Sequence, residues 1–493
     1  MRWIRINPAD NVAVALSDLH SGENACGVML ATDVPAGHKF TLTALSCGDD
    51  VIKYGFPIGH VSADVGIGCH LDHNIVHTNL EGLLDYKYSP VCLDPAPASE
   101  KLEFMGFRRA DGQVGVRNQI WIIPTVGCVN GICQTLAERL RSEIAGREGS
   151  VDAVVAFPHN YGCSQLGDDH ENTRKILADM VHHPNAGGVL VVSLGCENNQ
   201  LDAFMELVGS VDTSRVRTMT VQKIEGDETE YGMEQLRAIF SACSGDVRET
   251  VPVSELKVGL KCGGSDGLSG ITANPLVGRF SDWIVAHGGT TVLTEVPEMF
   301  GAETLLMNRC ADEGLFRQTV ALINDFKEYF IKLGQPVYEN PSPGNKAGGI
   351  STLEEKSLGC TQKSGSSVVR GVLKYGDTLK EKGLNLLSAP GNDLVASTAL
   401  AASGCQIVLF TTGRGTPFGS FVPTMKISTN TPLATRKPGW IDFNAGVLAE
   451  GESMDEVSDR FWKYVLAVAS GEKVNNEKNG WNEISIFKTG VTL

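Results

Sequence analysis

The feature that most constrains the fold is a regular alternation of apolar runs and amphipathic segments that begins near residue 103. Apolar runs at 120–127, 153–162, 188–195 and 217–224 are separated by segments whose apolar residues recur at helical spacing. Continuous apolar runs are typical of strands buried on both faces, and their alternation with helices is the pattern of a parallel α/β sheet. We therefore predict a parallel-sheet domain over residues 103–252.

The same alternation starts again further along the chain. Its apolar runs lie at 255–264, 288–298, 384–391 and 405–415, again with helical segments between them. A helix is predicted at 454–471 and a last strand at 483–493, where apolar and polar residues alternate. We expect a second parallel-sheet α/β domain over residues 253–493.

The N-terminal part has a different texture. Short strand-like runs such as NVAVAL (11–16) and VIKYGFPIG (51–59) are separated by closely spaced turn signals, and no long helical stripe appears. The stretch that follows, CLDPAPASEK, combines two prolines with small and charged residues, which is the composition of a linker. We predict a small β-rich domain at 1–91 and a linker at 92–102.

Charge and hydropathy exclude several classes of partner. Lys and Arg number 42 against 58 Asp and Glu, so the formal net charge is −16. Such an acidic chain repels phosphate backbones and anionic lipid surfaces, which argues against nucleic acid and membranes as partners. No apolar run approaches the roughly 18 residues that a membrane span requires, and no signal peptide precedes the strands. With 13 cysteines and no compact disulfide spacing, the expected location is the reducing cytoplasm.

One local pattern occurs three times in the first α/β block. An apolar strand ends in Gly-Cys at Cys128, Cys163 and Cys196, and each pair is followed by a helix-like segment. Ligands of open α/β sheets bind beyond the carboxyl ends of the strands, so the three thiols could face one another there. Three thiolates suit a soft metal ion or an iron–sulfur cluster with one open iron. The alternative is that each thiol packs in the core as a small hydrophobe.

Histidines and a lysine gather in the N-terminal part. His38 and Lys39 follow the turn PAG, and together they could bind a carboxylate or move a proton. His70, His73 and His77 lie close together in CHLDHNIVH, where they offer imidazole ligands or a general base. The alternative is a solvated rim of histidines.

Glycine-rich polar loops form the third group of candidates. They lie at 262–275, 339–349, 358–367 and 411–419, and each combines glycine turns with basic, hydroxyl or amide side chains. Backbone N–H groups in such loops bind anions, and a basic residue adds charge. None fits a P-loop or a dinucleotide fingerprint, so ATP and NAD are poorly supported. The loops suggest a hydroxyl-rich small molecule that carries a carboxylate; the alternative is glycine as ordinary loop punctuation.

Long and distinctive sequence words carry a family resemblance. They include PAGHKF, IKYGFPIG, HNYGCSQLGDDH, LGCENNQ, CGGSDGLSGITANP, EVPEMFGAE, ENPSPGNKAGGI and FTTGRGTPFG, and they extend over essentially the whole chain in one order. In these words the chain closely resembles the altronate/galactarate dehydratase family, and its words are most similar to the altronate branch. That resemblance implies an N-terminal domain of the β-clip (antifreeze-like, SAF) kind, ahead of the two α/β domains.

The resemblance also implies a reaction and a metal. The reaction is loss of water from D-altronate to give 2-dehydro-3-deoxy-D-gluconate, a step of hexuronate (galacturonate) catabolism. The implied metal is Fe2+, with Mn2+ as a possible substitute and an iron–sulfur cluster on the three cysteines as an alternative form. Removal of the C2 proton needs a base, and departure of the C3 hydroxyl needs an acid.

Combining the residue inventory with the resemblance assigns roles to particular side chains. Expected catalytic residues are His38, Lys39 and His73, of which His73 with Asn74 matches a His-Asn step of the family. Expected metal ligands are Cys128, Cys163 and Cys196, with Cys262 as a less favoured member. Expected substrate contacts are Asn11, Ser265, Asp266, Asn345, Lys346, Arg414 and Thr416.

Two alternative functions stay open at this stage. One is a dehydratase of the same family that acts on galactarate or another sugar acid. The other is a sugar-acid binding module that has lost its chemistry. For either dehydratase, a homo-oligomer is the expected assembly.

Overall fold

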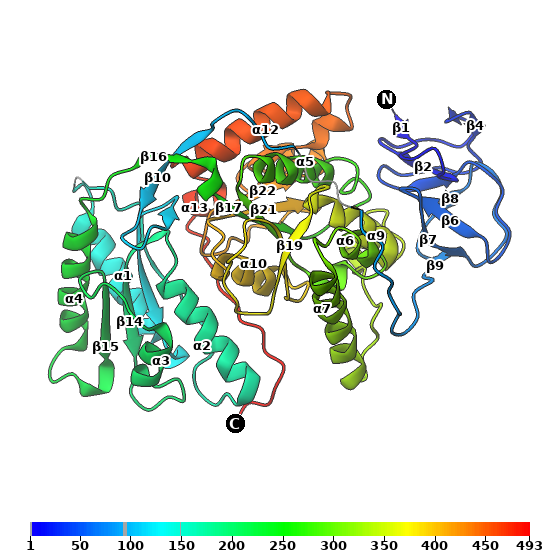
Figure 1. The fold of residues 1–493 in the computed structure, drawn as a ribbon. Helices are drawn as coiled ribbons and strands as arrows, with labels where there is room; N and C mark the ends of the chain where they lie inside the picture. Colours follow the sequence, from blue (N-terminus) through cyan, green and yellow to red (C-terminus); the bar gives the residue numbers. More distant parts are fainter. Residues whose placement is uncertain (1, 92–95, 148) are drawn as a thin grey trace.

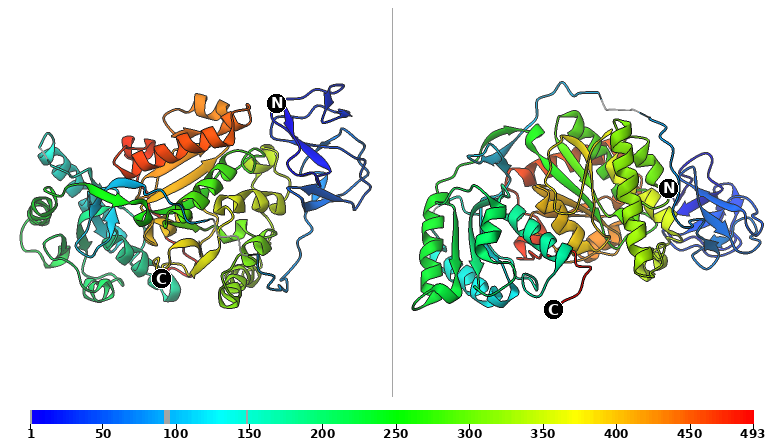
Figure 2. Two further views of the ribbon diagram at one scale, coloured as in Figure 1. Left: turned by 45° about the horizontal axis from the view of Figure 1, so that its top comes forward. Right: turned by 60° about the horizontal axis from the view of Figure 1, so that its bottom comes forward.

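The computed structural model describes residues 2–91, 96–147 and 149–493. It contains three units, and Figure 1 shows them side by side along the molecule. The N-terminal module lies at one end, the domain that follows it in sequence lies at the other end, and the C-terminal domain lies between them. Both views in Figure 2 show the same arrangement. The predicted fold class, a small β-rich domain followed by two parallel-sheet α/β domains, is confirmed.

The N-terminal module consists of short strands. One sheet has the order β1-β2-β5-β8, a second has the order β6-β7-β9, and β3 pairs with β4. The strands are β1 (Trp3–Ile4), β2 (Val12–Ala15), β3 (Asn24–Ala25), β4 (Val28–Met29), β5 (Lys39–Thr41), β6 (Asp50–Lys53), β7 (Phe56–Val61), β8 (His70–Leu71) and β9 (Val76–His77). All the pairings are antiparallel, which fits the closely spaced turns of the sequence.

The chain leaves the module along the surface of the C-terminal domain. The backbone N–H of Val91 donates to Asn308 O, and that of Ala98 donates to Ala286 O. Of the predicted linker 92–102, residues 92–95 lie outside the described residues, and 96–102 contain no helix or strand. The chain then crosses to the far side of the molecule to begin the next domain.

The middle domain is built on a parallel sheet of order β13-β12-β14-β15. Helices α1 and α4 pack on one face through a core that includes Leu136 and Leu236, and α2 and α3 cover the other face. Its elements are β12 (Gln119–Pro124), η1 (Gly127–Val129), α1 (Asn130–Ile144), β13 (Ala153–Ala156), α2 (Gly167–Val181), β14 (Ala186–Ser193), α3 (Leu201–Val208), β15 (Val216–Thr220), η2 (Val221–Lys223) and α4 (Glu228–Cys243). A small antiparallel sheet of β11 (Val114–Gly115), β10 (Glu103–Arg108) and β16 (Glu249–Pro252) joins this domain to the next.

The C-terminal domain has a seven-stranded parallel sheet of order β19-β20-β18-β17-β21-β22-β23. Helices α5 and α12 share a core with one face, and α10 covers the other face, where it also packs against α2 of the middle domain. The strands are β17 (Lys257–Cys262), β18 (Thr290–Leu293), β19 (Val369–Leu373), β20 (Gly383–Leu387), β21 (Ile407–Thr412), β22 (Thr424–Ser428) and β23 (Phe443–Asn444). The helices are η3 (Val253–Glu255), α5 (Ala273–Ala286), η4 (Val296–Glu298), α6 (Glu303–Met307), α7 (Glu313–Lys332), α8 (Pro343–Ala347), α9 (Leu353–Thr361), η5 (Gln362–Ser364), α10 (Asp393–Ala402), α11 (Thr431–Arg436), η6 (Gly446–Leu448), α12 (Met454–Ala469) and α13 (Asn475–Lys478).

The predicted last strand at 483–493 is wrong. Ile484 and Ile486 are buried, as the alternating pattern indicated, but no neighbouring strand pairs with them. Side chains take up the backbone N–H groups instead: the Phe487 N–H donates to the Tyr375 hydroxyl, and the Thr489 and Gly490 N–H groups donate to the Asp169 carboxylate. The tail therefore ties the C-terminal domain to α2 without extending a sheet.

A buried ion pair network fastens the N-terminal module to the C-terminal domain of its own chain. Lys39 Nζ and Lys53 Nζ each lie 2.8 Å from a different oxygen of Glu355, and all three side chains are almost fully buried. Although burial alone raises the pKa of a carboxyl group, the two lysines lower the pKa of Glu355 to about 2. The module is thus held by one carboxylate that both lysines require.

We expect Glu355→Gln to lower the free energy of unfolding by about 3–5 kcal/mol, because it leaves two buried ammonium groups without a counter-charge. Since the pKa of Glu355 lies below its ordinary value of 4.5, this stabilisation is complete above about pH 4.5 and is lost as the pH falls toward 2. Denaturant unfolding at several pH values measures both effects. Glu249→Gln, which breaks the exposed pair with Arg108, is the matched control and should change stability by about 0–1 kcal/mol. Equal effects of the two substitutions would contradict this account.

A crevice between the N-terminal module and the C-terminal sheet

The order of the strands places a crevice at the carboxyl ends of β17 and β21. Strands β18, β19 and β20 follow β17 in the chain and lie on one side of it in the sheet. The chain then crosses over, and β21, β22 and β23 lie on the other side of β17. Loops that leave two adjacent strands in opposite directions at such a switch point open a crevice, which is where open α/β sheets bind ligands. The loops here are the glycine-rich segments 262–270 and 411–419, two of the four that the sequence singles out.

The N-terminal module closes over this crevice at close range. A Cβ at Gly267 or Gly349 would overlap the carbonyl oxygen of Gly37, so these two positions need glycine for the module to seat. The Lys39 ammonium reaches further in and donates to Gly349 O at 3.2 Å and to Ser351 Oγ at 2.6 Å. The glycine-rich loops therefore serve partly as a docking surface for the module.

A histidine pair lies at the edge of the crevice. His38 Nδ1 and His70 Nε2 are 2.9 Å apart, and His38 Nε2 lies 3.4 Å from Ala347 O, next to Lys346. Burial lowers the pKa of both imidazoles, so both are neutral at pH 7. Because Ala347 O can only accept a hydrogen bond, His38 Nε2 carries the proton while that contact is made. Once the contact is released, a neutral His38 whose Nδ1–H donates to His70 Nε2 can accept a proton on Nε2 and share the resulting charge with His70.

Tyr54 of the module enters the crevice between two glycines. Its hydroxyl lies next to Gly270 and Gly359, positions at which a Cβ would collide with it or narrow the slot. A small cavity remains beside the ring, lined by Lys53, Tyr54, Ser265, Asp266, Asn274, Glu355, Lys356 and Cys360 among others. Polar groups from both units thus meet at one place.

Asp266 joins the loops of the crevice to one another. Its carboxylate accepts hydrogen bonds from Ser269 Oγ at 3.0 Å, Thr429 Oγ1 at 2.9 Å and Asn430 Nδ2 at 3.1 Å, and it packs directly on Gly413. Burial raises its pKa, and these donors act in the opposite direction. In this structure the carboxylate is occupied by protein groups, and its predicted contact with substrate stays a prediction.

The other predicted substrate contacts fall into two groups. Ser265 lines the small cavity, and the Asn345 amide donates to Ser265 O at 2.7 Å. Lys346 follows Asn345 in sequence, and Arg414 and Thr416 lie on the loop 411–419, where Arg414 is exposed. Asn11 lies inside the module, where its amide donates to Asp50 O and accepts from the Ile52 N–H. Lys39 holds Glu355, and His73 is exposed at a turn of the module. The functional roles of these residues remain predictions.

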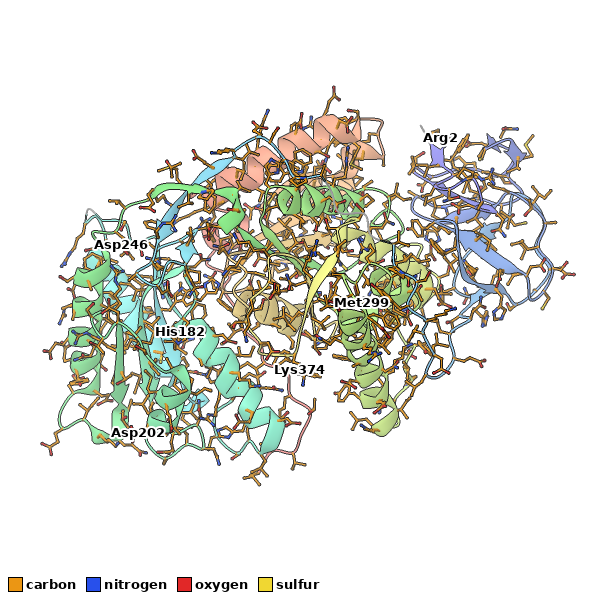
Figure 3. The ribbon with its side chains drawn as sticks, viewed as in Figure 1. Arg2, His182, Asp202, Asp246, Met299 and Lys374 are labelled. Carbon is orange, nitrogen blue, oxygen red and sulfur yellow. The ribbon has the colours of Figure 1, made fainter. Side chains whose placement is uncertain are left out.

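The three Gly-Cys loops come together in the middle domain. Their strands β13, β12 and β14 are neighbours, the Gly127 N–H donates to Tyr161 O at 3.0 Å, and the Asn199 N–H donates to Gly162 O at 3.0 Å. Cys128, Cys163 and Cys196 are all exposed at this edge. Figure 3 marks the region by Asp202, which lies at the far end of the molecule from the module and hence from His38. Within one chain the three thiols and the histidine pair are therefore separate.

A buried charged cluster beneath the crevice escaped the sequence analysis, apart from Cys262. Lys261 pairs with Glu295 and with Asp393, Lys363 pairs with Glu295 at 3.2 Å, and Lys356 pairs with Glu298 at 2.7 Å. Cys262 and Cys360 lie beside Glu298, and in the part of the chain that the structure describes these three form the one set of His, Cys, Asp or Glu residues with potential ligand atoms within 4.8 Å of one another. The one available signal was charged residues interrupting apolar runs, as in GLKCGG and EEKSLGCTQK.

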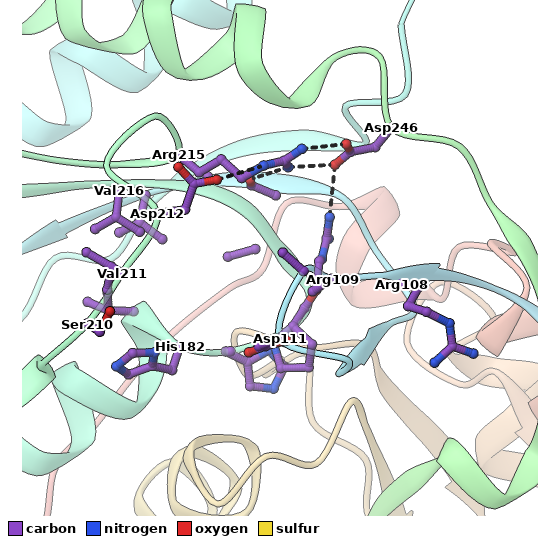
Figure 4. A pocket seen from close by; sticks show the side chains of 18 residues that line it. Arg108, Arg109, Asp111, His182, Ser210, Val211, Asp212, Arg215, Val216 and Asp246 are labelled. Carbon is purple, nitrogen blue, oxygen red and sulfur yellow. Dashed lines mark hydrogen bonds and ion pairs between the residues drawn. The ribbon is translucent and has the colours of Figure 1, made fainter.

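A cavity away from the crevice, in the middle domain, offers no comparable chemistry. It has a volume of about 390 Å³ and lies at the amino end of the middle sheet. Figure 4 shows that Arg109 and Arg215 both turn toward Asp246. The remaining N–H groups of Arg109 donate to Pro184 O, Arg117 O and Asn118, so these cations are already satisfied by the protein. A substrate anion is better served in the crevice.

Comparison with known proteins finds matches to family models in all three domains and relatives along the full length of the chain. Residues 1–79 match the altronate/galactarate dehydratase SAF domain, residues 106–244 match the second domain of D-galactarate dehydratase/altronate hydrolase, and residues 253–492 match the D-galactarate/altronate dehydratase C-terminal domain. The altronate dehydratase of Bacillus subtilis (strain 168) is 58% identical over 100% of this chain and 99% of its own length. That of Escherichia coli (strain K12) is 56% identical over 100% of both chains, and the galactarate dehydratase (L-threo-forming) of the same organism is 33% identical over 98% and 96%.

Fold, crevice and relatives together define a sugar-acid hydro-lyase. The chain belongs to the altronate/galactarate dehydratase family. The family resemblance and the SAF domain expected from the sequence are confirmed. Among residues 2–91, 96–147 and 149–493, no helix has both the length and the apolar character needed to cross a membrane.

Two substitutions separate the structural part of the crevice from its exposed part. Asp266→Asn should lower the free energy of unfolding by about 1–3 kcal/mol, because an amide cannot accept all the hydrogen bonds that the carboxylate receives. Arg414→Gln, on the exposed loop, should leave stability within about 0.5 kcal/mol of wild type and raise KM for the sugar acid. Denaturant unfolding and steady-state kinetics on both variants check this. A stable Asp266→Asn enzyme with a raised KM would instead identify Asp266 as a substrate contact.

Proposed function

We propose that this chain is an altronate dehydratase, which converts D-altronate into 2-dehydro-3-deoxy-D-gluconate and water in hexuronate catabolism. The observation that carries the proposal is full-length identity of 56–58% to two proteins named altronate dehydratase. The protein named galactarate dehydratase is more distant, at 33%, so galactarate is the second candidate substrate. The crevice supports either sugar acid, because basic, hydroxyl and amide groups surround it.

The reaction is a β-elimination followed by tautomerisation. A base removes the proton from C2, the C3–O bond breaks, and the hydroxyl leaves as water once it has been protonated. The resulting C2=C3 enol takes up a proton at C3 and becomes the 2-keto acid, so no oxidant or reductant is consumed. The difficult part is the first step, because a proton next to a carboxylate is only weakly acidic, and charge that develops on the carboxylate must be stabilised.

His38 is the proposed base. Its imidazole is neutral, its Nε2 edge faces Ala347 O at the long distance of 3.4 Å, and His70 contacts its other nitrogen. Substrate that displaces the weak contact to Ala347 O can place its C2 proton near Nε2. A positioned base of this kind typically contributes about 10²–10⁴-fold to the rate. The catalytic roles proposed for Lys39 and His73 come from the sequence, and in this arrangement Lys39 acts chiefly by holding the module closed.

Arg414 and Lys346 are proposed to bind the carboxylate and the polyol. Arg414 is exposed on one loop and Lys346 is partly exposed on another, and neither has a side-chain ion pair among the described residues. A guanidinium can hold a carboxylate through two parallel hydrogen bonds. Ser265, Asn345, Thr416 and Asp266 would contact the hydroxyl groups, and the same role is proposed for Asn11.

Fe2+ is the proposed metal, with Mn2+ as a possible substitute. When bound, such an ion would stabilise negative charge on the carboxylate and a neighbouring hydroxyl. Cys128, Cys163 and Cys196 suit iron by donor type, and a three-thiolate iron–sulfur cluster is the alternative form. Their sulfur atoms are not all within 4.8 Å of one another, so binding an ion would require the loops to bring them closer. Because these thiols lie away from the histidine pair in one chain, iron content and turnover have to be measured separately.

Assembly and location complete the proposal. A homo-oligomer in the cytoplasm, with no nucleic-acid or membrane partner, agrees with the acidic chain and with its 13 cysteines, of which the 12 that the structure describes are free thiols.

The direct test is formation of a 2-keto acid from D-altronate. Anaerobically purified protein should turn over D-altronate with Fe2+, lose this activity with a chelator, and act at least tenfold less efficiently on galactarate. Efficient turnover of galactarate alone would transfer the assignment to the second candidate. Binding of both sugar acids by folded, iron-loaded protein without product would indicate a binding module.

A second test concerns His38. His38→Gln should lower kcat by about 10²–10⁴-fold with a smaller change in KM, because it removes a base and not a binding group. In the wild type, kcat/KM should fall as the pH drops through the pKa of His38, which burial places below the ordinary 6.5. This acidic limb should disappear in the variant. His20→Gln, at an exposed histidine of the same module, is the control; an unchanged pH profile in His38→Gln would exclude His38 as the base.

A further inference from the structure

Two thiols and one carboxylate form a compact group beneath the crevice. Cys262 Sγ and Cys360 Sγ lie 3.3 Å apart, and both approach the same oxygen of Glu298, at 3.0 and 3.3 Å. Cys262 ends β17, Cys360 lies near the end of α9, and Glu298 ends η4, so three separate elements converge on this point. All three residues are buried, with at most 5% of their surface exposed.

These thiols differ from the other buried cysteines of the chain. Cys243 donates to the carbonyl oxygen of Phe240, Cys405 lies by Ser403, and Cys310 lies by Leu306 O and Thr319, which are the surroundings of thiols that pack as small hydrophobes. Cys262 and Cys360 instead face each other and an ionisable oxygen. Cys262 Sγ also lies 3.5 Å from Glu295 Oε2, and buried ammonium groups, among them Lys356 and Lys363, act on both thiols.

The geometry suits a divalent ion. Zinc-like ions bind thiolate sulfur at about 2.3 Å and carboxylate oxygen at about 2.1 Å. A triangle with sides of 3.0, 3.3 and 3.3 Å allows an ion at those distances to sit about 1 Å out of its plane. In that position the three protein ligands lie on one side of the ion, so a fourth ligand would have to come from the other side.

The charge of the surroundings also allows an ion. Three lysines (Lys261, Lys356 and Lys363) are balanced by three carboxylates (Glu295, Glu298 and Asp393) when both thiols are protonated. Exchange of the two thiol protons for one divalent ion leaves this balance unchanged, so the buried cluster gains no net charge. Lys356 contacts Glu298 Oε1 while the thiols face Oε2, so the ammonium and the ion would use different oxygens. Lys356 would then orient the ligand from outside the coordination shell.

The position of the group connects it to the crevice. Cys360 and Lys356 form part of the wall of the cavity that Tyr54, Asp266 and Asn274 complete. In Figure 3, Met299, the neighbour of Glu298 in sequence, lies in the half of the C-terminal domain that faces the module, far from Asp202 of the middle domain. The group therefore lies beside the cavity that Tyr54 of the module enters.

We propose that Cys262, Glu298 and Cys360 bind one thiophilic divalent metal ion, of the Fe2+ or Zn2+ type, at the floor of the crevice. This site is distinct from the one predicted at Cys128, Cys163 and Cys196. It rests on the proposed function only for the use of the ion in dehydration; binding of the ion stands on the donor set alone. Two thiolates and a carboxylate favour such ions over Mg2+ or Ca2+, which prefer all-oxygen ligands.

Co2+ is the probe for the test, because thiolate ligands give it a charge-transfer absorption in the near ultraviolet and a tetrahedral site gives intense visible bands. Full-length, reduced, metal-free protein is titrated anaerobically in the absence of any sugar acid. In a Cys128→Ser/Cys163→Ser/Cys196→Ser background, one equivalent of Co2+ per chain should remain, with the thiolate band. Adding Cys262→Ser or Cys360→Ser should remove that equivalent, whereas adding Cys405→Ser, at a buried cysteine outside the group, should not.

Glu298→Gln provides a second test of metal binding in case the cysteine variants do not fold. It keeps both thiols and should weaken Co2+ binding at least tenfold, with circular dichroism confirming the fold. Retention of the band and the full equivalent in both cysteine variants would overturn the proposal, as would a background variant that binds no Co2+ or that forms a Cys262–Cys360 disulfide in place of metal binding. Since no substrate is present, failure to dehydrate altronate would refute the proposed function without affecting this result.

Discussion

The crevice exists because one buried carboxylate holds two lysines from another unit. Glu355 lies near the start of α9, and Lys39 and Lys53 come from strands β5 and β6 of the N-terminal module. Charges with so little exposure are tolerated only when they are paired and hydrogen-bonded, so the module cannot shift without leaving ammonium groups uncompensated. This requirement fixes the distance between Gly37 and the glycine-rich loops, and with it the position of His38 above Ala347. The module is thus held by a buried ionic contact together with an apolar one, in which Ala302 and Leu358 pack against its core.

A second constraint arises from the sheet itself. The reversal of strand order at β17 and β21 opens the loops 262–270 and 411–419 in opposite directions, and Asp266 then joins them through Thr429, Asn430 and Gly413. Glycines in these loops therefore have two different duties. Gly413 and Gly267 permit close packing of a carboxylate and of the module, and the rest of each loop is left to present Arg414 and its neighbours to solvent. The glycine-rich loops thus form both the closely packed base of the crevice and its exposed edge.

The strands and helices of the α/β blocks could be predicted because apolar runs and helical spacing report burial directly. The helical segment expected between the runs 120–127 and 153–162 forms α1 (Asn130–Ile144). Strands β17 and β21 fall within the runs that predicted them, and β12 and β14 overlap theirs. β22 was missed because Lys426 interrupts its apolar run, although Lys426 has no exposed surface. The tail at 483–493 has the pattern of a strand and the burial of one, but hydrogen bonds to Tyr375 and Asp169 replace the partner strand. A local sequence pattern indicates which side chains are buried. It does not indicate which groups accept the hydrogen bonds of the backbone N–H groups.

The site was predictable only in part, for a related reason. His38, Asn345, Lys346 and Arg414 stand in unusual words at loop ends, and the structure brings these loops to one crevice. Lys39, the neighbour of His38, faces the opposite way toward Glu355, since successive residues at a strand end point to opposite sides. The pairing of Cys262 with Cys360 joins residues 98 positions apart, and no spacing rule covers a ligand set drawn from a strand, a 3₁₀ turn and a helix. The Gly-Cys pair occurs three times in the sequence, but this repetition shows only that three similar strands are followed by similar loops. Chemistry at one point in space depends instead on which dissimilar elements converge, and Cys262, Glu298 and Cys360, which converge beneath the crevice, share no sequence motif.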